Sequence, residues 1–340
     1  MKPEAPAATA DLVGHGWALD LLARSIERGR PSHAYLITGL PHVGKFSVAL
    51  AMAQQLLCAA VPACGHCRHC SLATRRVHPD LRVLELPPER RNIPLRDVHE
   101  FMQGIALRPL EATRKVYVVR GAEDLAEEGA NALLKTLEEP PPAVTIILTA
   151  PDPAGLLPTV VSRCQRIALH PVPPSEIAAH LVGRYEIDDD RADAIARASG
   201  GRPGWAILAA QHPGLMDERQ THARQLLDLL GADRLQRLQA ADSLADRWTA
   251  HQDEVRGVLE AWTDVWRDAL FVQEGVDDRV RSSELLPELR HTVSQLSAAG
   301  VQHALAFTLE TADSLERNAH PRLALEAYTL LLPRLVAGRG

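Results

Sequence analysis

No stretch of the sequence is apolar for long enough to cross a bilayer as a helix, so nothing predicts a membrane span. Basic residues are also scarce: 37 Lys and Arg stand against 43 Asp and Glu, and the net charge is -6. Because gripping nucleic acid through many phosphates requires clustered cations, this balance argues against a direct nucleic-acid reader, though not against a role beside one. Residues 1–15 contain no apolar h-region, so we expect a disordered lead, no signal peptide and a cytoplasmic protein.

Aromatic residues make up only 4% of the chain, whereas Ala and Leu are abundant, which suits a helix-rich protein. The apolar fraction of 46% is enough for real hydrophobic cores. A length of 340 residues exceeds one comfortable domain, so two or three domains are expected.

The stretch "GLPHVGKFS", residues 39–47, is close to the phosphate-binding P-loop, G-x-x-x-x-G-K-[ST]. Gly39, Gly44 and Lys45 fit the pattern, but Phe46 replaces the hydroxyl residue that would hold Mg²⁺. A short apolar run precedes the loop and a helical pattern follows it, which is the context that a P-loop requires. The loop is therefore a degenerate nucleotide-binding loop.

Apolar runs typical of buried strands alternate with helical patterns as far as residue 170, which predicts an α/β domain with a parallel sheet. The predicted strands lie at 33–39, 80–86, 115–120, 143–151 and before residue 170. Helices are expected over 17–30, 45–58, 95–107 and 126–139, the last of them stopped by three prolines. After "PVPP" at 171–174 the periodicity is almost only helical, first in a small unit to residue 212 and then in a longer region, 213–340.

Four of the five cysteines lie within thirteen residues of one another, at a spacing of C-x5-C-x2-C-x2-C. They are Cys58, Cys64, Cys67 and Cys70. Four thiolates on a short segment favour a closed, tetrahedral structural zinc site. An iron–sulfur cluster is less well supported, because the fourth cysteine of the ferredoxin pattern would be expected at position 74, which is Thr; free thiols are the other alternative. We interpret His66 and His69 as solvated loop residues.

With "CGHCRHC", "HPD" (78–80), "NALLKTLEEPP" (131–141) and "SRCQ" (162–165), the chain resembles bacterial DNA polymerase III clamp-loader subunits of the AAA+ class. The resemblance covers residues 39–165 in the family's order. It implies an AAA+ (RecA-like) domain at 1–170 with a zinc-binding insertion at 58–70, a small helical lid at 171–212 and an all-α collar domain at 213–340. It likewise implies zinc as the metal.

Three features at the nucleotide site depart from the pattern of working family members. Phe46 removes one Mg²⁺ ligand, and Arg120 and Gly121 occupy the positions of the Walker-B carboxylates. Glu123 remains, and we interpret it as a charge near a helix N-terminus. Trp205, in "GRPGWA", lies where the family has a sensor arginine, and Arg202 is expected in the turn before it.

Thr149 matches the family's sensor-1 position, although alone it contributes little. We expect ATP and Mg²⁺ to bind weakly or not at all and no intrinsic ATPase activity. The nucleotide site is thus interpreted as hydrolytically dead.

The "SRC" motif is intact, and the resemblance assigns its arginine, Arg163, as an arginine finger for a neighbouring subunit's ATP. On spacing alone, Arg163 is better interpreted as a surface arginine or as a partner of Glu138 or Glu139. The resemblance further implies a hetero-oligomer with gamma/tau ATPase subunits and a delta subunit. That complex places the sliding clamp on primed DNA during replication, with no membrane partner.

Three alternatives stay open at this point. The chain could be an active motor of the gamma/tau type, against which Phe46, Arg120 and Gly121 argue. It could be a P-loop kinase or transferase, which would leave "LLKTLEEPP" and "SRC" unexplained. It could also be a metal-dependent regulator built around the cysteine module, which ring assembly with clamp-loader subunits would distinguish.

Overall fold

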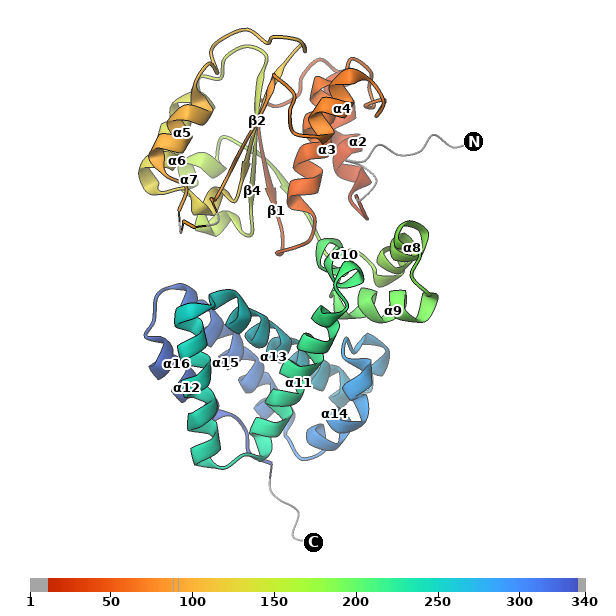
Figure 1. Cartoon of the computed structure of the whole chain (residues 1–340), viewed down its shortest axis with the longest axis vertical. Helices are drawn as coiled ribbons and strands as arrows, with labels where there is room; N and C mark the ends of the chain where they lie inside the picture. Colours follow the sequence, from red (N-terminus) through yellow and green to blue (C-terminus); the bar gives the residue numbers. More distant parts are fainter. Residues whose placement is uncertain (1–11, 88, 91, 336–340) are drawn as a thin grey trace. The chain divides into compact units, whose positions relative to one another are not determined.

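The computed structural model describes residues 12–87, 89–90 and 92–335 (Figure 1). Contacts divide the chain into two compact units, one made of residues 1–180 with 201–205 and the other of 181–200 with 206–340. The three-domain division at residues 170 and 212 stays a prediction.

A five-stranded parallel sheet forms the centre of the first unit, in the order β2-β3-β4-β1-β5. Its strands are β1 (Ala34–Thr38), β2 (Leu81–Glu85), β3 (Lys115–Arg120), β4 (Val144–Ala150) and β5 (Gln165–Ala168). β1 and β4 are buried along their whole length, because helices cover both faces of a sheet joined by crossover connections. The predicted parallel α/β fold is confirmed.

Successive side chains of each strand point into two different cores, one on each face of the sheet. Tyr35 and Ile37 pack with α2 and α3, whereas Ala34 and Leu36 belong to the core beneath α5, α6 and α7 (Figure 1). The helices are α2 (Gly16–Glu27), α3 (Lys45–Leu57), α4 (Arg68–Thr74), α5 (Leu95–Met102), α6 (Glu127–Glu138) and α7 (Pro158–Val161).

Two predictions for this unit are wrong in detail. The disordered lead predicted for 1–15 does not extend to its last residues: Val13 and His15 are buried, and His15 Nε2 lies 2.9 Å from the Val43 carbonyl oxygen. Residues 1–11 lie outside the described part of the chain. The helix expected over 95–107 ends at Met102, because Gln103 leaves the helical conformation (ψ 133°) and Gly104 follows in a left-handed one (φ 71°).

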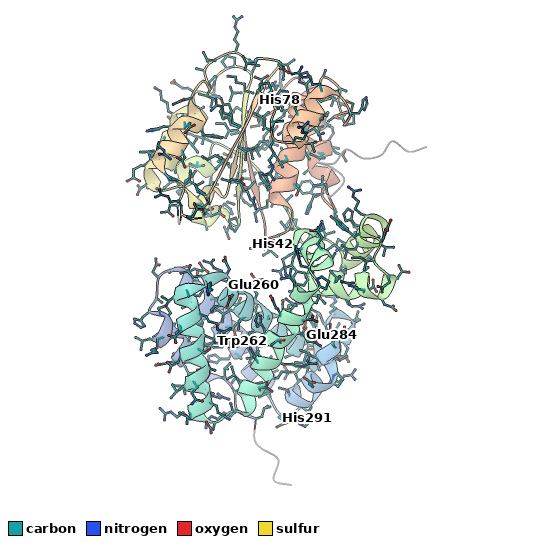
Figure 2. The ribbon with its side chains drawn as sticks, viewed as in Figure 1. His42, His78, Glu260, Trp262, Glu284 and His291 are labelled. Atoms are coloured by element: carbon teal, nitrogen blue, oxygen red, sulfur yellow. The ribbon has the colours of Figure 1, made fainter. Side chains whose placement is uncertain are left out.

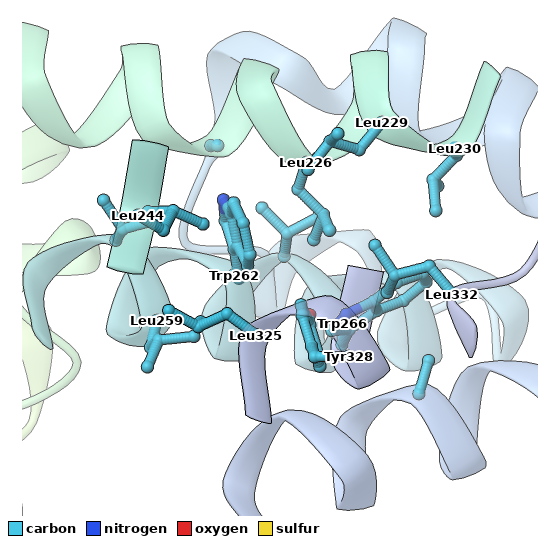
Figure 3. Close-up of a cluster of buried hydrophobic side chains, with 14 of the residues drawn as sticks. Leu226, Leu229, Leu230, Leu244, Leu259, Trp262, Trp266, Leu325, Tyr328 and Leu332 are labelled. Atoms are coloured by element: carbon cyan, nitrogen blue, oxygen red, sulfur yellow. The ribbon is translucent and has the colours of Figure 1, made fainter. Parts of the chain in front are cut away.

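Helices follow the sheet through the rest of the described chain, as the periodicity predicts. They are α8 (Pro174–Tyr185), α9 (Asp189–Ala198), α10 (Pro203–Gln211), α11 (Gly214–Gly231), α12 (Arg234–Ala250), α13 (Gln252–Gln273), α14 (Leu286–Val293), α15 (Ala298–Glu316) and α16 (Pro321–Leu331). Aromatic residues organise the core of α11–α16, where the rings of Trp262 and Tyr328 stack at 5.5 Å and Trp266 is fully buried (Figure 3). Within the described residues, no helix has the length and apolar character to span a membrane.

A fully buried arginine, Arg237 of α12, joins the ends of two other helices in this second unit. Its guanidinium donates to the carbonyls of Thr329 (3.2 Å), Leu332 (2.7 Å) and Pro333 (2.8 Å) at the end of α16, and to that of Leu230 (3.1 Å) at the end of α11. The last carbonyls of a helix have no partners within it and carry its negative partial charge. Both Nη groups of this buried cation are therefore paired with carbonyls at helix C-termini, while its Nε has no hydrogen-bond partner.

Candidate functional site: a P-loop pocket, a cysteine cluster and Arg163

The P-loop connects β1 to α3, as the sequence predicts. Gly39 has φ 148°, and a Cβ there would lie 2.7 Å from the Leu169 carbonyl oxygen, so this position accepts only glycine. Gly44, at φ 105°, is the N-cap residue of α3. Lys45 bends back on the loop, and its Nζ donates to the carbonyls of Gly39 (2.7 Å) and Leu40 (2.8 Å). The lysine that should neutralise phosphates is thus bound to the loop itself.

A pocket of about 550 Å³ opens beside the loop at the carboxyl ends of the strands. It is lined by loop residues, by the ends of β2 and β3 and by Thr149 of β4. Burial lowers the pKa of Lys45 and raises the pKa of Glu123. Each shift favours the neutral form of the side chain. Among the described residues that line the pocket are three carboxylates, Glu85, Glu123 and Asp124, and two cations, Lys45 and Arg120.

Phe46 is the centre of a charged cluster. The guanidinium groups of Arg76 and Arg120 lie 4.6 and 4.9 Å from the centroid of its ring, within cation–π range. Glu85 ties the two arginines together, with N–O distances of 3.1 Å to Arg120 and 3.9 Å to Arg76. The two departures from the family pattern, at 46 and 120, are therefore in contact with each other, and they replace a hydroxyl and a carboxylate with a ring and a cation.

At the second Walker-B position, Gly121 has φ 77°, a left-handed conformation that disfavours any side chain, and a Cβ there would require the Asp124 carboxylate to move. The Gly121 amide donates to the hydroxyl of Thr149 (3.1 Å), so the sensor-1-like residue is engaged with the backbone of β3. Glu123 lies in the first turn of a short 3-10 helix, Ala122–Asp124, which is a helix N-terminal position, and this helix is separate from α6, which has its own first-turn acids.

Residues 201–205 of the "GRPGWA" stretch belong to the first unit and lie against the P-loop. The Gly204 amide donates to the His42 carbonyl (2.8 Å), and a Cβ at Gly204 would lie 2.8 Å from that oxygen. Trp205 is in α10, whereas Arg202 precedes the helix and is buried, as expected for a residue in the turn. No cation replaces the sensor arginine at position 205 itself.

The four cysteine sulfurs converge at the start of α4, all within 4.8 Å of one another. Cys58 Sγ lies 3.8 Å from that of Cys64 and 3.9 Å from that of Cys67, and the sulfurs of Cys64 and Cys70 are 4.0 Å apart. Thiolates bound at about 2.3 Å from a tetrahedral ion lie about 3.8 Å from each other. The cluster therefore has the dimensions of a four-thiolate metal site.

Backbone amides point at the sulfurs and favour the thiolate form. Cys58 Sγ accepts from Ala60 (3.4 Å) and Cys64 (3.5 Å), and Cys67 Sγ accepts from Cys70 (3.5 Å). Amide hydrogen bonds lower the pKa of Cys64 to about 6, whereas burial raises the pKa of Cys70. The four residues thus supply the geometry that a divalent ion needs, and the amide donors support a thiolate at Cys64.

The histidines beside the cysteines differ from each other. His66 is exposed, as predicted, and its Nδ1 lies 2.8 Å from the Cys64 carbonyl oxygen. The prediction for His69 is wrong: it is half-buried, and its Nδ1 lies 2.8 Å from Nε2 of the buried His78. Figure 2 shows His78 and His42 at opposite ends of the unit, so this cluster is remote from the P-loop.

Arg163 follows α7 and precedes β5. Its Nη1 donates to the Thr159 carbonyl (2.9 Å), and its Nη2 forms an ion pair with Glu138 (2.7 Å). This is the partner that spacing alone suggested. Arg163 nevertheless keeps a third of its side-chain surface exposed. Cys164, the next residue, packs against the core beneath α6, and burial raises the pKa of its thiol to about 11.

Two groups of site residues were missed from sequence. The Arg76–Glu85 pair has no local signal, because the two residues meet only through the fold. His78 and Asp80 do have one, since both lie in the "HPD" motif. Asp80 is buried and accepts three backbone N–H groups, which outweigh the effect of burial and hold its pKa below the usual range.

Comparisons with known proteins agree on a family. The sequence model described as "DNA polymerase III, delta subunit" matches residues 14–173. The chain is 26% identical to DNA polymerase III subunit delta' of Bacillus subtilis, over 92% of this chain and 94% of that protein. It is 35% identical to subunit delta' of Pseudomonas aeruginosa, over 69% and 71%. It is also 31% identical to subunit gamma/tau of Mycobacterium tuberculosis, covering 96% of this chain but 61% of that protein.

These similarities, with the parallel sheet and the P-loop at its edge, define a clamp-loader subunit of DNA polymerase III. Within that class the chain belongs to the delta-prime subunit family.

Proposed function

We propose that this chain is the non-hydrolysing member of the clamp loader and that it completes a neighbouring subunit's ATPase site with Arg163. The observation that carries the proposal is the contrast between the two sites. The chain's own pocket has lost its Mg²⁺ ligands to Phe46 and Arg120, whereas Arg163 is intact and partly exposed. Such a subunit is a stator in the loading of the sliding clamp on primed DNA.

The sheet register supports action on a neighbour. In β5, Gln165 pairs with Tyr35, and β1 then runs four residues further to Gly39, where the P-loop begins. At about 3.3 Å per residue this is roughly 13 Å along the sheet, and Arg163 lies two residues further back still. Arg163 is thus near the end of the sheet opposite its own P-loop, so its natural target is another chain's nucleotide.

The ion pair with Glu138 is compatible with that role. Both side chains are substantially exposed, with relative exposures of 33% for Arg163 and 49% for Glu138. An exposed pair of this kind contributes about 0–1 kcal/mol. Releasing Arg163 to a γ-phosphate therefore requires little free energy, and Glu138 holds the side chain near the subunit surface until then.

Turnover measurements test the proposal against the motor alternative. ATP hydrolysis is measured with sliding clamp and primed DNA for this chain alone, for the gamma/tau and delta subunits alone, and for the full mixture. We expect no turnover by the chain alone and stimulation in the mixture. Turnover by this chain alone, abolished by Lys45→Ala, would replace the stator with a motor.

We also propose that the four cysteines hold one structural Zn²⁺. A closed set of four thiolates leaves no coordination position for a reacting water. The ion would therefore cross-link the 58–70 segment and take no part in a catalysed reaction. We predict one zinc per chain by elemental analysis of gently purified protein. Cys67→Ser should abolish it, whereas Cys164→Ser, outside the cluster, should not. A metal-free wild-type protein, or an iron content in place of zinc, contradicts the proposal.

The remaining assignments rest on the family. We propose that residues 171–212 act as the lid, that 213–340 form this chain's part of the oligomeric collar, and that gamma/tau and delta subunits are the direct partners. The pocket retains Lys45 and its glycines, so we expect nucleotide binding to be weak or absent. Equilibrium binding of a fluorescent ATP analogue to the isolated chain measures it.

A further inference from the structure

The loop between α5 and β3, residues 103–114, carries two exposed leucines but is firmly anchored. Leu107 and Leu110 are 68% and 76% exposed. Behind them, the buried carboxylate of Asp80 accepts the amides of Leu110 (2.7 Å), Glu111 (2.8 Å) and Ala112 (2.8 Å). Hydrogen bonds to an ionised acceptor are the strong ones, so Asp80 fixes this loop in one conformation.

Asp80 is tied in turn to the cysteine cluster through two histidines. The Asp80 amide donates to Nδ1 of His78 (3.0 Å), so that nitrogen carries no proton. A neutral His78 then has its proton on Nε2 and donates it to Nδ1 of His69 (2.8 Å). A series of hydrogen bonds therefore connects His69 to His78, His78 to Asp80, and Asp80 to the loop.

The series of contacts from the loop through Asp80 and His78 ends on a helix, α4, whose position depends on the cysteines. His69 lies between Cys67 and Cys70 on α4, a helix of seven residues with Cys67 as its N-cap. A helix this short is not stable by itself. A second contact crosses from the same helix to the loop, because Arg68 pairs with Glu111 (2.9 Å). Two neighbouring residues of α4 thus hold the loop, one directly and one through His78.

We propose that the cysteine module is a positioning device for the 103–114 loop: by fixing α4, a bound metal holds His69 and Arg68 where they secure the loop that presents Leu107 and Leu110. The inference rests on the metal part of the proposed function. It gives the "HPD" motif and His69 a role that neither the P-loop nor Arg163 requires.

A second metal ion on His69, His78 and Glu111, whose ligand atoms also lie within 4.8 Å of one another, explains the contacts less well. Nitrogens bound to one tetrahedral zinc at about 2.0–2.1 Å lie about 3.3 Å apart. The 2.8 Å between the two imidazoles is instead the distance of a shared proton. Glu111 is also already paired with Arg68.

Amide hydrogen exchange on the full chain tests whether the cysteine module positions the 103–114 loop. Its readouts are the amides of Leu110, Glu111 and Ala112, with zinc content measured on the same samples and α6 as the internal reference. Removing zinc with a chelator should speed exchange of the three loop amides about tenfold, the size expected when a fixed hydrogen bond is lost, and added zinc should restore it. His69→Ala should speed them similarly while keeping the zinc. His66→Ala, an exposed neighbour on the same segment, is the matched control and should change neither.

Each outcome decides between the proposals. If chelation loosens α4 but not the loop, or if His69→Ala leaves loop exchange unchanged, the positioning role is overturned while the zinc site stands. If gently purified protein contains no zinc, the metal proposal fails and the device with it, even where His69→Ala loosens the loop. If Asp80→Ala, which removes both acceptor oxygens, fails to speed exchange of the three loop amides, the anchoring of the loop is wrong.

Discussion

Replacing Arg163 by alanine is expected to lower ATP turnover at the neighbouring subunit's site by about 10³–10⁵-fold, because an arginine finger stabilises charge that develops on the γ-phosphate in the transition state. The loss should appear in the rate constant and not in folding of the chain, since within its own chain Arg163 makes partly exposed contacts, to Thr159, Ser162 and Glu138. Single-turnover hydrolysis by the reconstituted complex, with the other ATPase sites inactivated, measures it.

Two matched variants separate a finger from a surface charge. Arg166→Ala removes an exposed arginine of β5 three residues further on and should leave turnover unchanged. Glu138→Ala releases Arg163 from its ion pair and should retain or raise turnover. Equal effects of the Arg163 and Arg166 variants would show that only the net charge of this surface matters.

Replacing Arg237 by alanine is expected to destabilise the second unit by roughly 3–5 kcal/mol, because several carbonyls lose a donor, at about 1–3 kcal/mol for each buried group left unpaired, and a large side chain leaves a packed site. The variant removes the donor of three carbonyls at the end of α16 and one of the two donors of the Leu230 carbonyl at the end of α11, which keeps the amide of Leu335 (3.0 Å). Urea unfolding followed by the fluorescence of Trp262 and Trp266, which lie in the same core, measures the loss.

The control for this variant is Arg234→Ala. Arg234 is exposed at the start of the same helix, α12, so its removal changes the charge without uncovering a buried carbonyl. Arg237→Met, which restores the volume of the side chain but none of its hydrogen bonds, should remain destabilised. A methionine variant as stable as the wild type would show that Arg237 acts through packing alone.

The sheet could be predicted because buried parallel strands leave a strong local pattern. The run "AVTIILTAP" has few alternatives to a buried strand, and prolines 140–142 end α6 almost where expected. The end of α5 could not be placed, since residues 103–107 continue the helical pattern and the helix is ended by the extended ψ of Gln103 and the positive φ of Gly104. Arg237 could not be recognised as buried, because its partners are backbone groups of helices that meet α12 only in the folded chain.

The candidate site was predictable in its parts but not in their relations. The cysteine spacing predicts a cluster, and the structure brings the four sulfurs together. The contact of Phe46 with both Arg76 and Arg120 joins an α3 residue to the turn after α4 and to the end of β3, so no spacing reveals it. The roles of Arg163 and Thr149 stay predictions.

The Phe46 cluster also bears on how such a site can change over evolutionary time. A reversion to Thr at 46 would restore one magnesium ligand but leave Arg76 and Arg120 without the ring that separates them, while Gly121 still offers no carboxylate. A reversion to Asp at 120 would remove one of the two partners of Glu85 and place a second carboxylate beside it. Each of these single substitutions therefore breaks contacts within the Phe46 cluster and still leaves the site without a full set of Mg²⁺ ligands.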